Sequence, residues 1–123
     1  MPTYGTPQAG GVVTSLSPGD KGYQLFNGTE VAAQGLKSVS VARGGAFAGD
    51  NGISFFASGM PLTSVIQIQA SNDDVDGHYT VVGTINPDAN GNGAYTDIGR
   101  AGFYRAVLST YVSGAMPVVV ADR

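Results

Sequence analysis

From residue 22 onward, apolar and polar residues alternate in short runs that glycine, asparagine, aspartate and proline interrupt at intervals of about ten residues. A period of two places successive side chains on opposite faces of a β-strand, one face toward a core and the other toward solvent. The clearest example is the run of residues 64–70, whose isoleucines share one face and whose glutamines share the other. This alternation predicts half-buried strands rather than helices.

The turn-bounded runs predict about eight short strands, and no apolar run keeps the helical period of 3.6 residues for longer than one turn. Residues 29–34 are the one stretch that could form a helical turn. Such a pattern predicts an all-β fold, an antiparallel two-sheet sandwich of the jelly-roll or immunoglobulin-like type. The pattern alone does not choose between these two topologies. The predicted strands span residues 22–26, 36–43, 53–57, 64–70, 78–85, 94–98, 103–110 and 116–121.

The first 21 residues differ from the rest because they are rich in proline and glycine and contain little that could form a strand. We therefore predict an extended N-terminal arm over residues 1–21 and a sandwich domain over residues 22–123. Two interpretations of the arm stay open, a disordered tail and a segment that becomes ordered by lying on a partner. In the second, the anchors on the partner are Tyr4, Val12, Val13 and Leu16.

The composition excludes several classes of function. The 123 residues contain no cysteine, which removes disulfides, thiolate metal sites and cysteine nucleophiles together. Six Lys and Arg residues against nine Asp and Glu residues give a net charge of -3, which does not suit nucleic-acid binding. No run is long enough to span a membrane and no signal peptide is visible, so we expect synthesis in a host cytoplasm. Only 12% of the residues are charged, which favours a protein packed against neighbours.

One acidic loop, residues 73–77, could ligate calcium through Asp73, Asp74 and Asp76. An EF-hand loop also needs a glutamate at its twelfth position, and the only glutamate of the chain is far away at position 30. We therefore expect a hairpin turn in which the side chains cap the backbone and Gly77 takes a positive φ. Weak calcium binding is the alternative.

The only histidine, His78, lies beside this loop. A Ser-His-Asp triad could in principle combine it with Asp76 or Asp97, but no Gly-x-Ser-x-Gly nucleophile motif occurs. A single histidine also excludes a site with two histidine ligands. The inventory predicts that the chain is not an enzyme and has no catalytic residue, no metal site and no cofactor.

Arginine and tyrosine are the residue types most enriched at protein interfaces. Arg105 is placed within the predicted strand 103–110, either facing solvent or forming a buried ion pair with a nearby aspartate. The arginines expected to face a partner are Arg43, Arg100 and Arg105. The aromatic residues available to stack against a sugar ring are Tyr79, Tyr95, Phe103 and Tyr111.

The segment VIQIQAS at residues 65–71, followed by NDDVDGHYTVVGTI and then by YTDIGRAGFYRAVLST, resembles a pattern in small phage virion proteins. Related sandwiches occur among capsid decoration (cement) proteins and head fibres of tailed phages, and the alternation also occurs in carbohydrate-binding sandwiches. The resemblance covers residues 65–110. It implies a structural protein on the capsid surface of a virion that bridges major capsid subunits as a homo-oligomer, a dimer or trimer, with no nucleic-acid or membrane partner. The alternative is a carbohydrate- or ligand-binding module associated with a head fibre or tail.

Overall fold

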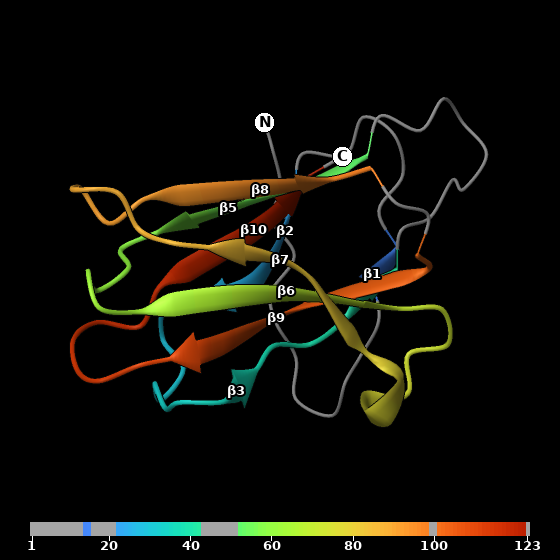
Figure 1. The fold of residues 1–123 in the computed structure, drawn as a ribbon, viewed down its shortest axis with the longest axis horizontal. Helices are drawn as coiled ribbons and strands as arrows, with labels where there is room; N and C mark the ends of the chain where they lie inside the picture. The colour runs from blue at the N-terminus through green and yellow to red at the C-terminus, as the bar shows by residue number, and fades with distance from the viewer. Residues whose placement is uncertain (1–13, 16–21, 43–51, 99–100, 123) are drawn as a thin grey trace.

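The computed structural model describes residues 14–15, 22–42, 52–98 and 101–122. These residues form two β-sheets packed face to face (Figure 1). Within the described ranges the one helical element is η1, a 3-10 turn at Asp76–His78. The strands are β1 (Thr14–Ser15), β2 (Tyr23–Asn27), β3 (Leu36–Lys37), β4 (Val41–Ala42), β5 (Ile53–Ser58), β6 (Val65–Ser71), β7 (Thr80–Ile85), β8 (Gly93–Asp97), β9 (Phe103–Thr110) and β10 (Val118–Asp122).

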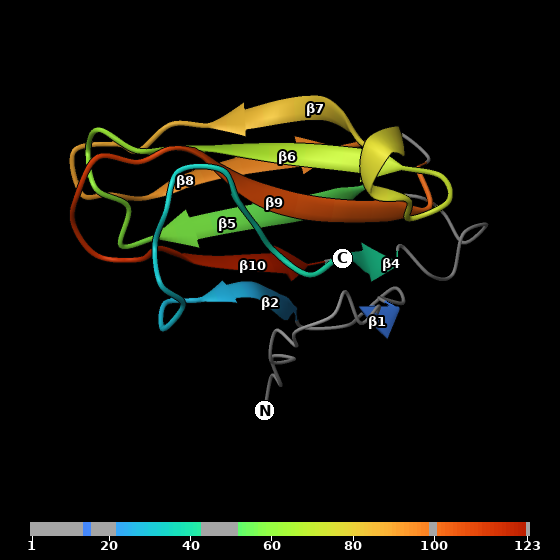
Figure 2. The same ribbon diagram turned by 90° about the horizontal axis from the view of Figure 1, so that it is seen from below.

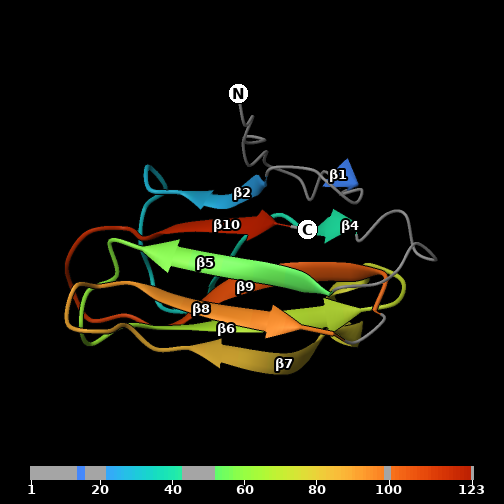
Figure 3. The same ribbon diagram turned by 90° about the horizontal axis from the view of Figure 1, so that it is seen from above.

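The strand order identifies the topology. One sheet has the order β2-β10-β5-β8, and the other has the order β1-β4-β9-β6-β7 with β3 also on β9. The pairs are nested, because β6 pairs with β7, β5 with β8, β4 with β9 and β2 with β10. This is a long hairpin rolled into two sheets, the arrangement of a jelly roll rather than of an immunoglobulin domain. Figure 2 looks toward the six-stranded sheet and Figure 3 toward the four-stranded sheet.

All strand pairs are antiparallel except β1, which runs parallel to β4 at the edge of the six-stranded sheet. The two residues of β1 fall inside the range predicted as an arm, so part of that range adds to the domain's own sheet. The remaining residues of the range, with its predicted anchors, lie outside the described residues.

Two predictions about the segment between β2 and β4 are wrong. Residues 36–43 do not form one strand, because residues 38–40 interrupt it and the Ser38 hydroxyl accepts a bond from the Ala106 amide in place of a regular ladder. Residues 29–34 contain no helical turn. The Glu30 carboxylate instead accepts hydrogen bonds from the amides of Asn27 and Gly28, which ties the segment back to the end of β2.

The core lies between the sheets and follows the predicted alternation. On β6, Ile66 and Ile68 are fully buried, and on β9 so are Tyr104 and Leu108. Burying each such side chain contributes about 1.5–3 kcal/mol. The other fully buried large side chains are Leu25, Phe26, Val41, Ile53, Phe55, Ile85, Pro117 and Val119.

One tyrosine joins the edges of the two sheets. The register of β6 and β7 shifts so that Val82 has no partner on β6. The hydroxyl of Tyr95, on β8, lies 2.7 Å from the Val82 carbonyl oxygen and donates to it. The ring crosses directly over Gly83, where an added Cβ would lie 2.5 Å from the ring's Cε1 and Cε2 atoms. A glycine at this position is therefore what lets the two edges meet.

Candidate functional site

The loop between β6 and β7 is built by its own side chains. The Ser71 hydroxyl accepts hydrogen bonds from the amides of Asp73 and Asp74, at 3.1 Å each, and donates to the Asp73 carboxylate. The expected turn is present, but its positive φ of 57° belongs to Asp74 and not to Gly77. Aspartate tolerates this conformation, and here its carboxylate accepts the Tyr79 hydroxyl at 2.5 Å.

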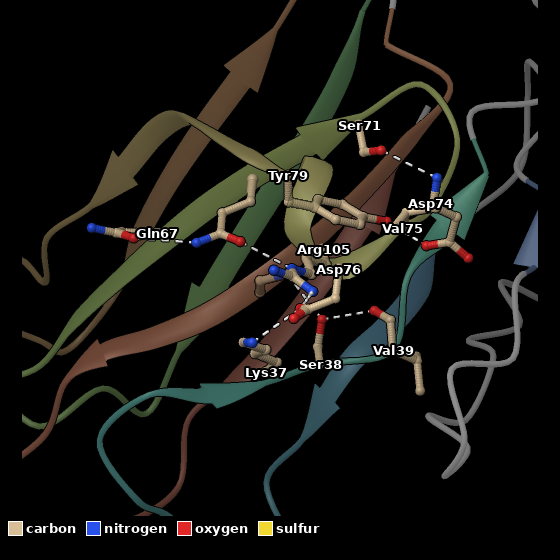
Figure 4. Close-up of polar contacts among 12 residues, drawn as sticks. Lys37, Ser38, Val39, Gln67, Ser71, Asp74, Val75, Asp76, Tyr79 and Arg105 are labelled. Atoms are coloured by element: carbon tan, nitrogen blue, oxygen red, sulfur yellow. Dashed lines mark hydrogen bonds and ion pairs between the residues drawn. The ribbon is translucent and has the colours of Figure 1, made fainter.

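This loop folds over the outer face of the six-stranded sheet and covers Arg105 (Figure 4). Arg105 is 9% exposed, and its guanidinium donates from Nε to Gln69 at 2.9 Å and from Nη1 to Asp76 at 2.6 Å. The guanidinium carbon also lies 4.0 Å from the centre of the Tyr79 ring, in a cation–π contact. Lys37 adds a second cation to Asp76 at 3.0 Å. We name these five residues the Arg105 cluster.

Of the two placements predicted for Arg105, the structure has the ion pair, in which Arg105 is buried but the Asp76 side chain is 67% exposed. Its guanidinium makes contacts within the chain, and its predicted role toward a partner stays a prediction. The other residues predicted to contact a partner lie outside the described residues, and they are Tyr4, Val12, Val13, Leu16, Arg43 and Arg100.

The aspartates of the loop have separate partners. A hydrogen bond from His78 lowers the pKa of Asp73, and one from Arg105 lowers the pKa of Asp76. Burial and the Asp74 carboxylate raise the pKa of Tyr79. In the described part of the chain, no three histidine or acidic side chains come together as metal ligands. Each carboxylate of the loop accepts a hydrogen bond from another group of the chain, so the local geometry is that of a turn.

His78 contacts neither of the aspartates considered from the sequence. Its Nδ1 lies 2.6 Å from one oxygen of Asp73, whose other oxygen accepts the Ser71 hydroxyl at 2.9 Å. The carboxylate therefore separates the hydroxyl from the imidazole, whereas in a catalytic triad the imidazole lies between them. This group orients the imidazole and does not activate a serine.

Beside His78 lies a pocket of about 430 Å³. It is lined by Ala70, Ser71, Asn72, His78, Thr80, Val82, Asp97 and Ala101. The Asp97 carboxylate, at the end of β8, accepts the Tyr104 hydroxyl at 2.5 Å and lies 3.1 Å from the Tyr95 hydroxyl. Sequence reasoning missed this pocket because its walls come from four separate segments, which only the fold brings together.

The aromatic residues predicted as sugar platforms are engaged within the chain. Tyr79 lies against the Arg105 guanidinium, and the Tyr95 ring crosses to β7. Tyr111 donates its hydroxyl to a backbone carbonyl of the following loop, and Phe103 is half-buried. Stacking of a ligand on these rings therefore has less support than hydrogen bonding in the pocket.

The outer face of the four-stranded sheet has a different character. Phe56 is 50% exposed at its centre, and its register partners on the neighbouring strands are Ala94 and Val120. Ser54 and Thr96 share a hydrogen bond of 2.8 Å beside it. Among its described residues this face, which we name the bare face, has one charged side chain, that of Asp122 at one end. The described residues of the bare face are Gln24, Asn27, Ser54, Phe56, Ser58, Ala94, Thr96, Val118, Val120 and Asp122.

The chain matches no protein-family model, no curated protein and no solved structure. Within the described residues, none of the helical structure is long and apolar enough to cross a membrane.

Proposed function

We propose that this chain is a structural virion protein without catalytic activity, a capsid decoration (cement) protein of a tailed phage. In this role it binds the outside of the head, bridges major capsid subunits and associates with further copies of itself as a dimer or trimer. The single observation that carries the proposal is the bare face. A sheet face with a half-exposed phenylalanine and, among its described residues, one charged side chain is suited to packing against protein.

The fold is compatible with this role, because jelly rolls occur in viral capsid proteins as well as in lectins and cupins. A fold does not by itself define a function, so the argument rests on the surfaces. With one histidine and no cysteine in the sequence, the residue inventory supports contact over metal chemistry.

The size of the bare face supports a repeated contact. Four strands about 4.8 Å apart, with about five residues each at about 3.4 Å per residue, present about 300 Å². Stable interfaces usually bury about 800 Å² on each partner, so one such contact is weak. On a capsid the same contact is repeated many times, and linked copies gain avidity without any new contact.

The pairing at the edge strand β4 supports a contribution of the N-terminal residues to capsid attachment. β1 adds to this edge as a parallel strand, so a segment of the predicted arm pairs with a sheet within the described structure. Neighbouring residues of the arm could add to an exposed sheet edge of a capsid subunit in the same way. We expect deletion of residues 1–21 to abolish attachment and to leave the domain folded. A second deletion, of residues 1–13, removes the residues before β1 and keeps β1. If both truncated proteins still saturate capsids, the arm has no role in attachment.

The bare face is tested by co-sedimentation of the purified chain with empty heads of the virus that encodes it. The test variant is Phe56→Lys, and the matched control is Val81→Lys, since Val81 on β7 is 51% exposed and lies outside the bare face. We expect the wild type and the control to saturate the heads, and Phe56→Lys to bind at least about tenfold more weakly because it would bury an unpaired charge. Equal attachment of all three proteins would refute the role of the bare face, and no attachment of the wild type would refute the virion role.

The second candidate is a carbohydrate- or ligand-binding module of a head fibre or tail. The observation that favours it is the pocket beside Asp97, which is a concave surface with convergent polar groups.

A further inference from the structure

We infer that the pocket between His78 and Asp97 binds a neutral sugar residue through hydrogen bonds. The inference concerns a ligand and not a protein partner. It rests on the second candidate function, for which it names the class of ligand, and it does not depend on the proposed attachment to a capsid.

The central group of the site is the Asp97 carboxylate. Oδ2 accepts the hydroxyl of the fully buried Tyr104 at 2.5 Å, and Oδ1 lies 3.1 Å from the hydroxyl of Tyr95. A carboxylate offers about four acceptor positions, so both oxygens keep capacity for another donor. The hydroxyl of Tyr104, on β9, thus holds the carboxylate in place before a ligand arrives, which reduces the entropy lost on binding.

The opposite wall presents an oriented imidazole. His78 Nδ1 is held at 2.6 Å from Asp73, which leaves Nε2 as the ring nitrogen available to a ligand. Asn72 and Thr80 line the same pocket with exposed side chains, an amide and a hydroxyl that can each donate and accept. Adjacent hydroxyls of a sugar ring need this mixture of donors and acceptors.

The charge and lining of the pocket define the class of ligand. Asp97 is the one acidic side chain among the described lining residues, and none of these residues is lysine or arginine, so they disfavour an anion. The described residues hold no group of three metal-ligating side chains, so a cation would lack the ligands it needs. The small apolar side chains of Ala70, Val82 and Ala101 can contact the C–H face of a sugar ring. A volume of about 430 Å³ falls at the lower end of the range for small-molecule sites.

Five of the eight described lining residues belong to strands, Ala70 and Ser71 to β6, Thr80 and Val82 to β7 and Asp97 to β8. Asp97 ends β8, and Val82 and Thr80 belong to β7, whose edge is fastened to β8 by the Tyr95 hydroxyl. Ser71, at the end of β6, is buried and bound to the loop that positions His78. Polar groups on strand ends keep their geometry better than groups on free loops.

The experiment is a titration of the full, isotope-labelled chain followed by amide chemical shifts. The probes are the methyl glycosides of glucose, galactose, mannose, N-acetylglucosamine and N-acetylgalactosamine. We expect at least one probe to bind with a Kd of about 1 mM, the affinity of a small ligand held by a few hydrogen bonds. The shifted amides should belong to residues 70–72, 78–82, 97 and 101.

Two variants remove single polar groups from the rim without touching the buried tyrosines. Asn72→Ala and Thr80→Val should each raise the Kd by about tenfold. The matched control is Thr96→Val, which removes a threonine hydroxyl from β8 on the bare face and should leave the Kd unchanged. Asp97→Asn keeps the shape of the side chain and should also weaken binding, with the amide spectrum reporting whether the fold is intact.

The inference is overturned if no probe shifts the pocket amides at concentrations well above the expected Kd. It is also overturned if a probe binds and Asn72→Ala and Thr80→Val bind it as the wild type does. The attachment of these variants to capsids is measured separately, so failure of the sugar site and failure of the virion role are distinguishable.

Discussion

Replacing Gly83 by alanine tests how the two sheets are joined at their edges. The glycine lies under the Tyr95 ring, and a Cβ at this position would come within 2.5 Å of two ring atoms. Gly83 lies in β7 outside the left-handed region, so its backbone conformation accepts alanine and the ring is what opposes the new Cβ. The ring must move, and its hydroxyl then leaves the Val82 carbonyl oxygen.

The expected magnitude follows from these contacts. Forcing extra atoms into a packed contact costs about 1–3 kcal/mol, and the lost hydrogen bond about 1 kcal/mol, so we expect Gly83→Ala to lower the free energy of unfolding by about 2.5 kcal/mol. Tyr95→Ala should lower it by about 2 kcal/mol, because the ring is only half-buried. In the Tyr95→Ala background the clash is absent, and alanine should stabilise the strand relative to glycine by about 0.5 kcal/mol.

These values predict a coupling energy of about -3 kcal/mol between the two positions. The assay is urea unfolding of the four proteins of the double-mutant cycle, followed by far-UV circular dichroism because the chain contains no tryptophan. If Gly83→Ala has the same effect in both backgrounds, or if it stabilises the wild type, Tyr95 does not bridge the sheets over Gly83.

Three further predictions concern the loops. In urea unfolding, Gly91→Ala should lower the free energy of unfolding by about 2–3 kcal/mol, because φ is +79° and the new Cβ would lie 2.7 Å from a backbone carbonyl oxygen. The control Gly35→Ala, at φ +87° in open space, should lower it by only about 1 kcal/mol. Equal effects of the two substitutions would contradict this account. Arg105→Met should cost about 2 kcal/mol and speed amide exchange in residues 72–79, and unchanged exchange would show that the Arg105 cluster does not hold the loop. The pKa values of Asp76 and Asp88 are lowered from 3.8, by Arg105 and by backbone amides respectively, so their contribution to stability is present above 3.8 and is lost as the pH falls through the lowered values. The urea midpoint should therefore fall as the pH is lowered below 3.8, and less steeply in Asp88→Asn.

The sequence predicted the structural features that depend on residues close together in the chain. The bounds of Phe103–Thr110 agree with the structure, and the isoleucines of the strand Val65–Ser71 are buried as the alternation requires. The choice of topology was not available from the pattern, because the nested pairs, such as β2 with β10, join segments from opposite ends of the chain. Alternation states which face of a strand is buried and does not state which strand lies beside it.

The candidate site was less predictable for the same reason. Arg105 had two possible environments, and the ion pair with Asp76 exists because the loop after β6 folds back over the sheet. The prediction for Gly77 failed because Asp74 takes the left-handed conformation, where its carboxylate also meets the Tyr79 hydroxyl. No local sequence pattern indicates that Asn72, Thr80 and Asp97 line one pocket.

The most direct test of the proposed virion role is quantitative mass spectrometry of density-purified particles of the virus that encodes the chain. The account predicts that the chain is present in intact particles at a fixed ratio to the major capsid protein, and that it stays with heads from which the tails have been removed. Absence of the chain from purified particles, with the protein recovered only in the soluble fraction of the lysate, would contradict the central claim.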